Sequence, residues 1–176
     1  MNRLLHLHEF ALFLNRTEIH LAVQRWTRSN LYVIPAVQGI HLAAMCVIVG
    51  SIGMIGLKMA GFRRAGSGQS LPAMMRKLLP WTWVAIVVQI VTGAFMVIDR
   101  PGRAIDSLTF PWKMAMLLVG ILLTLFLQIA ARRNPAFWDA PERPRLAVRA
   151  LGVASVLLWV GIIFAGRWIY YEKAAL

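Results

Sequence analysis

The sequence predicts an all-α integral membrane protein: a four-helix bundle of membrane spans, preceded by an N-terminal amphipathic helical segment at the membrane interface. Of the 176 residues, 59% are hydrophobic and the mean hydropathy is +0.65, well above that of a water-soluble domain. Four apolar runs reach the roughly 20 residues that a helix needs to cross the hydrocarbon core. These runs and their connections fill the chain, so we expect one bundle and no second domain.

The strong positive charge of the chain is consistent with a membrane protein. The formal net charge is +12, and the lysines and arginines lie between the apolar runs. Cations at these positions follow the positive-inside rule and contact anionic headgroups. We therefore expect the partner of this charge to be the lipid bilayer and not nucleic acid.

Residues 1–30 mix apolar and charged side chains at helical spacing and are too polar to span a bilayer. This pattern predicts an amphipathic segment lying on one membrane face. The apolar part of the first 20 residues is too short for a cleaved signal peptide. We expect residues 31–176 to form the four-helix domain.

Start and stop residues bound the four spans. Pro35 suits the first turn of a helix, where its missing N–H is not needed. Ser70 can cap the second helix, and Pro80 is expected to kink it near the surface. Gln89 and Thr92 are its polar residues at depth. The predicted spans are about 34–58, 78–98, 110–131 and 149–171.

Small residues recur along the first span at steps of three and four and predict a face for close helix packing. These residues are Gly39, Ala43, Cys46, Gly50 and Gly53. Because Gln38, His41 and Met45 share the opposite side, we expect this span to be enclosed on both sides and central in the bundle.

Orientation follows from the cations in the connections. The first and third connections are rich in lysine and arginine, whereas the short second connection has only Arg100 and Arg103. The positive-inside rule therefore predicts cytoplasmic first and third connections. Both termini and the second connection are expected to be extracytoplasmic, in a bacterial inner membrane.

Under this topology, three cationic or protonatable side chains share one level. His41 lies roughly 10 Å below the outer surface, and Lys113 and Arg167 roughly 6 Å below it, at about 1.5 Å per residue. Ionisable groups at depth indicate a functional site by default. Asp99 and Asp106 flank the second connection and could pair with these groups.

Structural explanations stay open for the same residues. Lys113 and Arg167 are close enough to the surface for their long side chains to reach it. His41 is too deep and too short for this, but could be a neutral histidine hydrogen-bonded to Gln38, Thr92 or a backbone carbonyl.

Five segments, in this order, resemble the bacterial integral-membrane family catalogued as domain of unknown function 6644: IPAVQGIHLAAMCVIVGSIGMIGLKMAG, LLPWTW, TGAFMVID, FPWKMAML and AGRWIYY. The resemblance covers nearly the whole chain and implies the fold but no settled activity. One departure is GLKMAG, where the family usually has an acidic-basic pair such as DLRLLG. More distantly, His41 and Lys113 are similar in placement to residues of copper-resistance D proteins and of haem-associated HemJ-type protoporphyrinogen oxidases.

The first functional hypothesis is a redox subunit that binds haem b or quinone near the outer face and exchanges electrons with an extracytoplasmic or membrane partner. For haem, His41 would be an axial ligand, Lys113 and Arg167 would pair with the propionates, and Gln38 would orient the imidazole. Candidates for a second axial ligand are His8, His20 and Met45. For quinone, His41 would hydrogen-bond a carbonyl oxygen and exchange its proton.

Two other hypotheses stay open. The chain could be a non-catalytic membrane anchor or subunit of a larger complex. It could also transport copper, since His41, Met45 and Cys46 supply suitable ligands, although Cys46 lies about 140° around a regular helix from His41. We do not expect the isolated chain to be an enzyme, because it shows no nucleophile-base pair and no carboxylate pair at depth.

Overall fold

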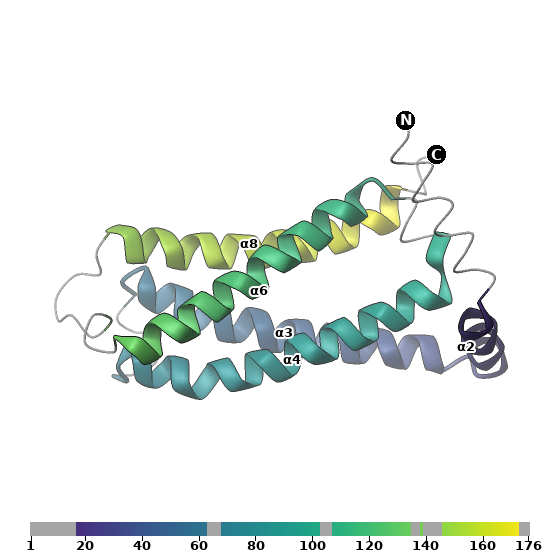
Figure 1. Cartoon of the computed structure of the whole chain (residues 1–176), viewed down its shortest axis with the longest axis horizontal. Coiled ribbons are helices and arrows are strands. Elements are labelled where there is room, and N and C mark those ends of the chain that lie inside the picture. The colour runs from purple at the N-terminus through teal and green to yellow at the C-terminus, as the bar shows by residue number, and fades with distance from the viewer. Residues whose placement is uncertain (1–16, 63–67, 103–106, 135–137, 139–145, 173–176) are drawn as a thin grey trace.

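The structure, a computed structural model, describes residues 17–62, 68–102, 107–134, 138 and 146–172. Within these residues it has α2 (Glu18–Ser29), α3 (Val33–Met59), α4 (Leu71–Asp99), α6 (Thr109–Arg133) and α8 (Leu146–Glu172) (Figure 1). The last four are long and apolar enough to cross a membrane. The prediction of an all-α protein with four spans is confirmed, and the chain is a multi-pass membrane protein.

The helix α4 begins well before the apolar run that it carries into the bilayer. Ser70 is its N-cap, and the Ser70 hydroxyl accepts a hydrogen bond from the Ala73 N–H at 3.4 Å. Pro80 lies inside α4, and the helix continues on both sides of it. Because proline has no N–H, the carbonyl of Arg76 loses its partner in the helix.

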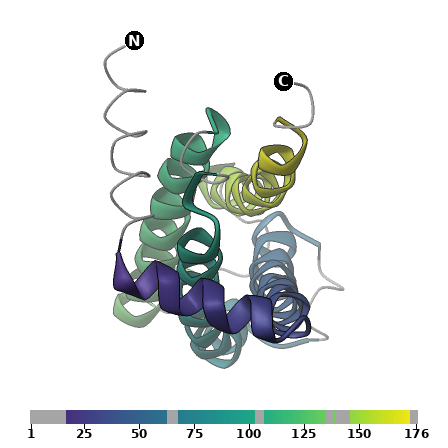
Figure 2. The ribbon, with the colours of Figure 1, turned by 90° about the vertical axis from the view of Figure 1, so that its right-hand side faces the viewer.

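The helix α3 lies between α4 and α8, so its predicted central position is confirmed, but the prediction that it is enclosed on both sides was wrong, because Gly39, Cys46 and Gly50 are exposed. This helix packs against both α4 and α8, whereas α6 packs mainly against α8 (Figures 1 and 2). We call the boundary between α4 and α6 the α4–α6 seam, and contact across it is sparse. The buried core follows α3 and its neighbours: Ile48, Ile52, Ile55, Met59, Met75, Leu79, Leu127, Trp159 and Ile162.

The backbones of α3 and α8 meet at two glycines. A Cβ added to Gly56 would lie 2.8 Å from the Gly152 carbonyl oxygen, and one added to Gly152 would lie 2.7 Å from the Met59 Cβ. Both distances are shorter than non-bonded carbon and oxygen atoms tolerate. The close approach of these helices therefore requires glycine at both positions.

The predicted packing face of the first span was wrong. A Cβ at Gly39, Gly50 or Gly53 would meet nothing within 4 Å, and Cys46 is exposed. Lipid accepts small side chains without cost, so a stripe of small residues does not by itself indicate where the neighbouring helix lies. The face of α3 that packs is instead the one that carries its isoleucines and Gly56.

The helix α2 lies across one end of the bundle, in front of the ends of α3 and α4 in Figure 2. Three contacts join it to α4. His20 Nδ1 donates to the Ile98 carbonyl at 2.5 Å, and the Thr27 hydroxyl donates to Asp99 Oδ1 at 2.9 Å. Trp26 meets Phe95 edge to face, with ring centroids 6.0 Å apart. The remainder of the predicted amphipathic segment, residues 1–16, lies outside the described residues.

Replacing Thr27 with valine is expected to loosen α2 from the bundle. The change keeps the shape of the side chain but removes a donor to the buried Asp99 carboxylate, which costs about 1–3 kcal/mol. Thr27→Ser retains the hydroxyl and is the matched control. Limited proteolysis in detergent micelles should cleave near α2 faster in Thr27→Val only; equal rates in all three proteins would contradict this anchoring role.

Candidate functional site

A cavity of about 220 Å³ lies among all four spanning helices, at the end of the bundle that α2 crosses. It is formed where α3 and α6 begin and where α4 and α8 end, because adjacent spans run in opposite directions. Its lining residues are Ile34, Gln38, His41, Gly93, Met96, Val97, Asp99, Arg100, Phe110, Lys113, Gly166 and Ile169. The polar or ionisable side chains of the wall are those of Gln38, His41, Asp99, Arg100 and Lys113, and the other lining residues are apolar.

His41 is half-buried, and both nitrogens of its imidazole have partners on α4. His41 Nδ1 lies 2.7 Å from the Thr92 hydroxyl oxygen, and His41 Nε2 lies 2.7 Å from Gln89 Nε2. The Thr92 hydroxyl also lies 2.6 Å from the Val88 carbonyl, to which it donates. In this arrangement the Gln89 amide donates to Nε2, and Nδ1–H donates to Thr92. His41 is therefore held as the neutral imidazole with its proton on Nδ1.

Gln89 is the partner of His41 that the sequence analysis did not assign. It is buried, and its Nε2 also lies 4.0 Å from Met45 Sδ. Its Oε1 has no hydrogen-bond partner among the described residues. The sequence contained an indication of this contact. Gln89 and Thr92 are three residues apart and so share one face of α4, which means that a residue that contacts Thr92 can also contact Gln89.

Lys113 brings a cation to the cavity from α6. A Cβ at Gly166 of α8 would lie 3.2 Å from Lys113 Nζ, so the ammonium lies directly against the α8 backbone. In the described part of the chain, Lys113 has neither an ion pair nor a hydrogen-bond partner. A half-buried ammonium in this position leaves its three N–H donors for water or for a ligand.

Arg167 does not join the other predicted site residues. It is exposed, it does not line the cavity, and its guanidinium lies over the Tyr171 ring at 5.6 Å from the centroid. The structure thus brings together Gln38, His41 and Lys113 but leaves Arg167 outside. Its position agrees with the alternative in which a long cationic side chain reaches the membrane surface.

Asp99 lines the cavity. The sequence suggested an ion pair between Asp99 and Lys113, but the structure does not have it. Asp99 is buried, accepts the Thr27 hydrogen bond, and pairs with Arg100 Nε at 3.2 Å from Oδ2. Its charge is therefore satisfied by α2 and by its sequence neighbour, because α2 folds back over the end of α4. Asp106 lies outside the described residues.

The residues around the cavity do not fit haem. An axial histidine needs a free ring nitrogen, and both nitrogens of His41 are engaged. The cavity is also smaller than the roughly 300–1,000 Å³ of most small-molecule sites, and a porphyrin needs more. Of the other proposed ligands, His20 is bonded to Ile98, Met45 is buried beside Gln89, and His8 lies outside the described residues.

The donor set does not favour a metal either. Among the described residues, no group of three or more His, Cys, Asp or Glu side chains is close enough to hold an ion. Cys46 is exposed whereas Met45 is buried, so the two side chains face different surroundings. Among the described residues that line the cavity, His41 supplies the one imidazole, and both of its nitrogens already have partners.

The comparisons with known proteins identify the family and leave the activity open. No curated protein and no solved structure matches the chain. The similarity to copper-resistance D and HemJ-type proteins therefore stays a prediction. A family model described as a family of unknown function matches residues 20–172, which include α2 from its third residue and all four spans. The chain accordingly belongs to the family of unknown function DUF6644.

Proposed function

We propose that this protein is a redox subunit of the membrane that binds the head group of a quinone in the cavity beside His41 and Lys113. The observation that supports this most is the ammonium of Lys113, which has no partner among the described residues and faces a small cavity between four spanning helices. About 220 Å³ suits a compact ring better than a porphyrin, and an isoprenoid tail could extend into the surrounding lipid.

Lys113 and Gln38 supply the hydrogen-bond donors in this proposal, whereas Asp99 and Arg100 pair with each other. Lys113 donates to a carbonyl oxygen of the ring and stabilises the negative charge that develops there on reduction, as a charge-assisted hydrogen bond. The Gln38 amide, exposed at the cavity wall, supplies a second donor. The electrons come from a redox centre of a membrane or extracytoplasmic partner, and each carbonyl oxygen takes up a proton.

Gln89 allows His41 to change its protonation state without losing a hydrogen bond. With the amide nitrogen toward His41 Nε2, the imidazole is neutral. If the amide turns over, the unpartnered Gln89 Oε1 faces Nε2 and can accept from an N–H there. His41 can then hold a proton, which is the chemistry for which histidine is suited, and the proton reaches the reduced ring only when the imidazole leaves one of its two partners on α4.

Replacing Lys113 with glutamine is expected to weaken quinone binding by about 10- to 100-fold, since a hydrogen bond to a charged group contributes about 1.5–3 kcal/mol. Binding of a short-tailed benzoquinone or naphthoquinone to the purified protein in nanodiscs can be measured by tryptophan quenching. Lys77→Gln removes an exposed lysine at the other end of the bundle and should bind like the wild type. No saturable binding to the wild type, or equal losses in both variants, would overturn the proposal.

Arg167→Gln separates this site from the three-residue cluster that the sequence suggested. Because Arg167 lies outside the cavity, its loss should leave the quinone Kd unchanged, whereas His41→Phe should raise it. If neither variant changes binding, the His41 network serves only to join α3 to α4. That outcome would favour the alternative of a non-catalytic anchor or subunit.

A further inference from the structure

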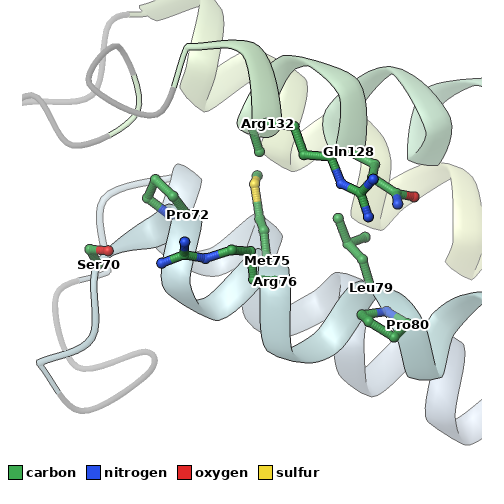
Figure 3. Close-up of a pocket in the computed structure, with 9 residues that line it drawn as sticks. Ser70, Pro72, Met75, Arg76, Leu79, Pro80, Gln128 and Arg132 are labelled. Atoms are coloured by element: carbon green, nitrogen blue, oxygen red, sulfur yellow. The ribbon is translucent and has the colours of Figure 1, made fainter.

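A second pocket, of about 490 Å³, lies at the other end of the bundle, between the beginning of α4 and the end of α6 (Figure 3). It occupies the α4–α6 seam, where the two helices make few contacts. Met75, Leu79 and Pro80 supply its apolar wall. The pocket therefore opens toward the lipid at the level where α4 begins and α6 ends, which is the headgroup level of a spanning helix.

The charged side chains that line this pocket are both arginines. Arg76 comes from α4 and Arg132 from α6, and neither has an ion pair or a hydrogen-bond partner in the described part of the chain. In Figure 3, the Arg76 side chain extends toward Pro72, whereas that of Arg132 extends toward Gln128. No acidic side chain lines the pocket among the described residues. Two guanidinium groups without a partner in the described ranges, beside an apolar wall, are complementary to an anion that also carries apolar chains.

A hydrogen bond across the seam determines which atoms Gln128 offers to the pocket. The Trp83 indole N–H donates to Gln128 Oε1. Because an indole N–H can only donate, the oxygen of the Gln128 amide must face Trp83, and the NH₂ group stays available as a donor. Gln128 is one of the lining residues, and its amide nitrogen lies on the Arg132 side in Figure 3.

We propose that this pocket binds an anionic phospholipid. The phosphate diester accepts hydrogen bonds from Arg132 and the Gln128 amide, Arg76 contacts the headgroup, and an acyl chain lies along Leu79 and Pro80. A surface arginine that merely reaches the headgroups would need neither a concave site nor an amide held by Trp83. The cation-rich connections at this end place the pocket, under the positive-inside rule, in the cytoplasmic leaflet, where anionic lipids attract basic sites.

Lipid retention by the purified protein tests this proposal. Native mass spectrometry should show a lipid adduct with phosphatidylglycerol and at most a weak one with phosphatidylcholine. Arg132→Gln is expected to lower the fraction carrying phosphatidylglycerol by about tenfold, on the scale of a lost charge-assisted hydrogen bond. Arg133→Gln is the matched control, because Arg133 has the same charge on the same helix but does not line this pocket. It should retain lipid like the wild type.

Trp83→Phe tests the amide orientation apart from the charge. It leaves every cation in place but releases the Gln128 amide, so we expect about a threefold loss of bound phosphatidylglycerol, within the span of a neutral hydrogen bond. Equal retention of phosphatidylcholine, or equal losses in Arg132→Gln and Arg133→Gln, would overturn the site. Inorganic phosphate that displaces the lipid would show a free-anion site instead of a lipid site. The lipid-retention experiment does not depend on whether the protein binds quinone.

Discussion

Replacing Gly152 with leucine is expected to separate α3 from α8 and to destabilise the bundle strongly. Any side chain at this position would meet the Met59 Cβ at 2.7 Å and the Gly56 carbonyl oxygen at 2.8 Å. These atoms belong to the α3 backbone or are fixed to it, so no rotamer change can relieve the clash. Overpacking typically costs about 1–3 kcal/mol, and we expect the upper end of this range or more.

Gly50→Leu is the control for the Gly152 prediction. It adds the same side chain to α3 at a position where a Cβ meets nothing within 4 Å. The unfolding temperature of the detergent-solubilised protein should fall for Gly152→Leu and stay near the wild-type value for Gly50→Leu. If both variants lose the same stability, the two glycines of the α3–α8 contact do not determine how closely these helices approach.

Trp159→Ala is expected to be the second strongly destabilising change. Trp159 is 1% exposed, and its ring packs against Gly120 of α6 and beside Ile162, which is also fully buried. Loss of a buried tryptophan leaves a cavity that the helices cannot fill, at a cost of about 3–5 kcal/mol. Thermal unfolding in detergent measures this loss, and Trp168→Ala, at an exposed position, should have little effect.

Trp159→Phe distinguishes packing from hydrogen bonding at the same position. The indole nitrogen of Trp159 has no hydrogen-bond partner among the described residues, so phenylalanine removes volume without removing a bond. We expect a cost of about 1 kcal/mol, well below that of alanine. A phenylalanine variant as unstable as the alanine variant would contradict this packing explanation, because phenylalanine restores most of the ring volume.

The order and direction of the spans predict part of the candidate site. Adjacent spans run in opposite directions, so the first and third spans both start at the same membrane face. Residues near the start of these two spans therefore lie at the same depth. On this basis His41 and Lys113 were expected at one level, and in the structure they line the same cavity. Arg167 met the same depth criterion but faces away, because depth does not specify the direction of a side chain around its helix.

The partners of the polar residues could not be predicted. Gln89 and Thr92 were visible as polar residues in an apolar span, yet only the packing of α3 on α4 places both against the His41 ring. Asp99 is paired by Thr27 because α2 folds over the end of α4. Such pairings depend on rotations and crossings of helices, which hydropathy does not encode.

The sequence by itself determined that this protein crosses the membrane four times, where the spans lie, and which ends of them share a level. Those properties follow from the length of apolar runs and the placement of charge, because the hydrophobicity of each segment by itself decides whether that segment inserts into the bilayer. Only the tertiary structure decided which faces touch: Gly56 and Gly152, not the stripe along Gly39, Gly50 and Gly53, carry the close packing. The physical reason is that lipid and protein interior are about equally apolar, so a side chain that suits one suits the other.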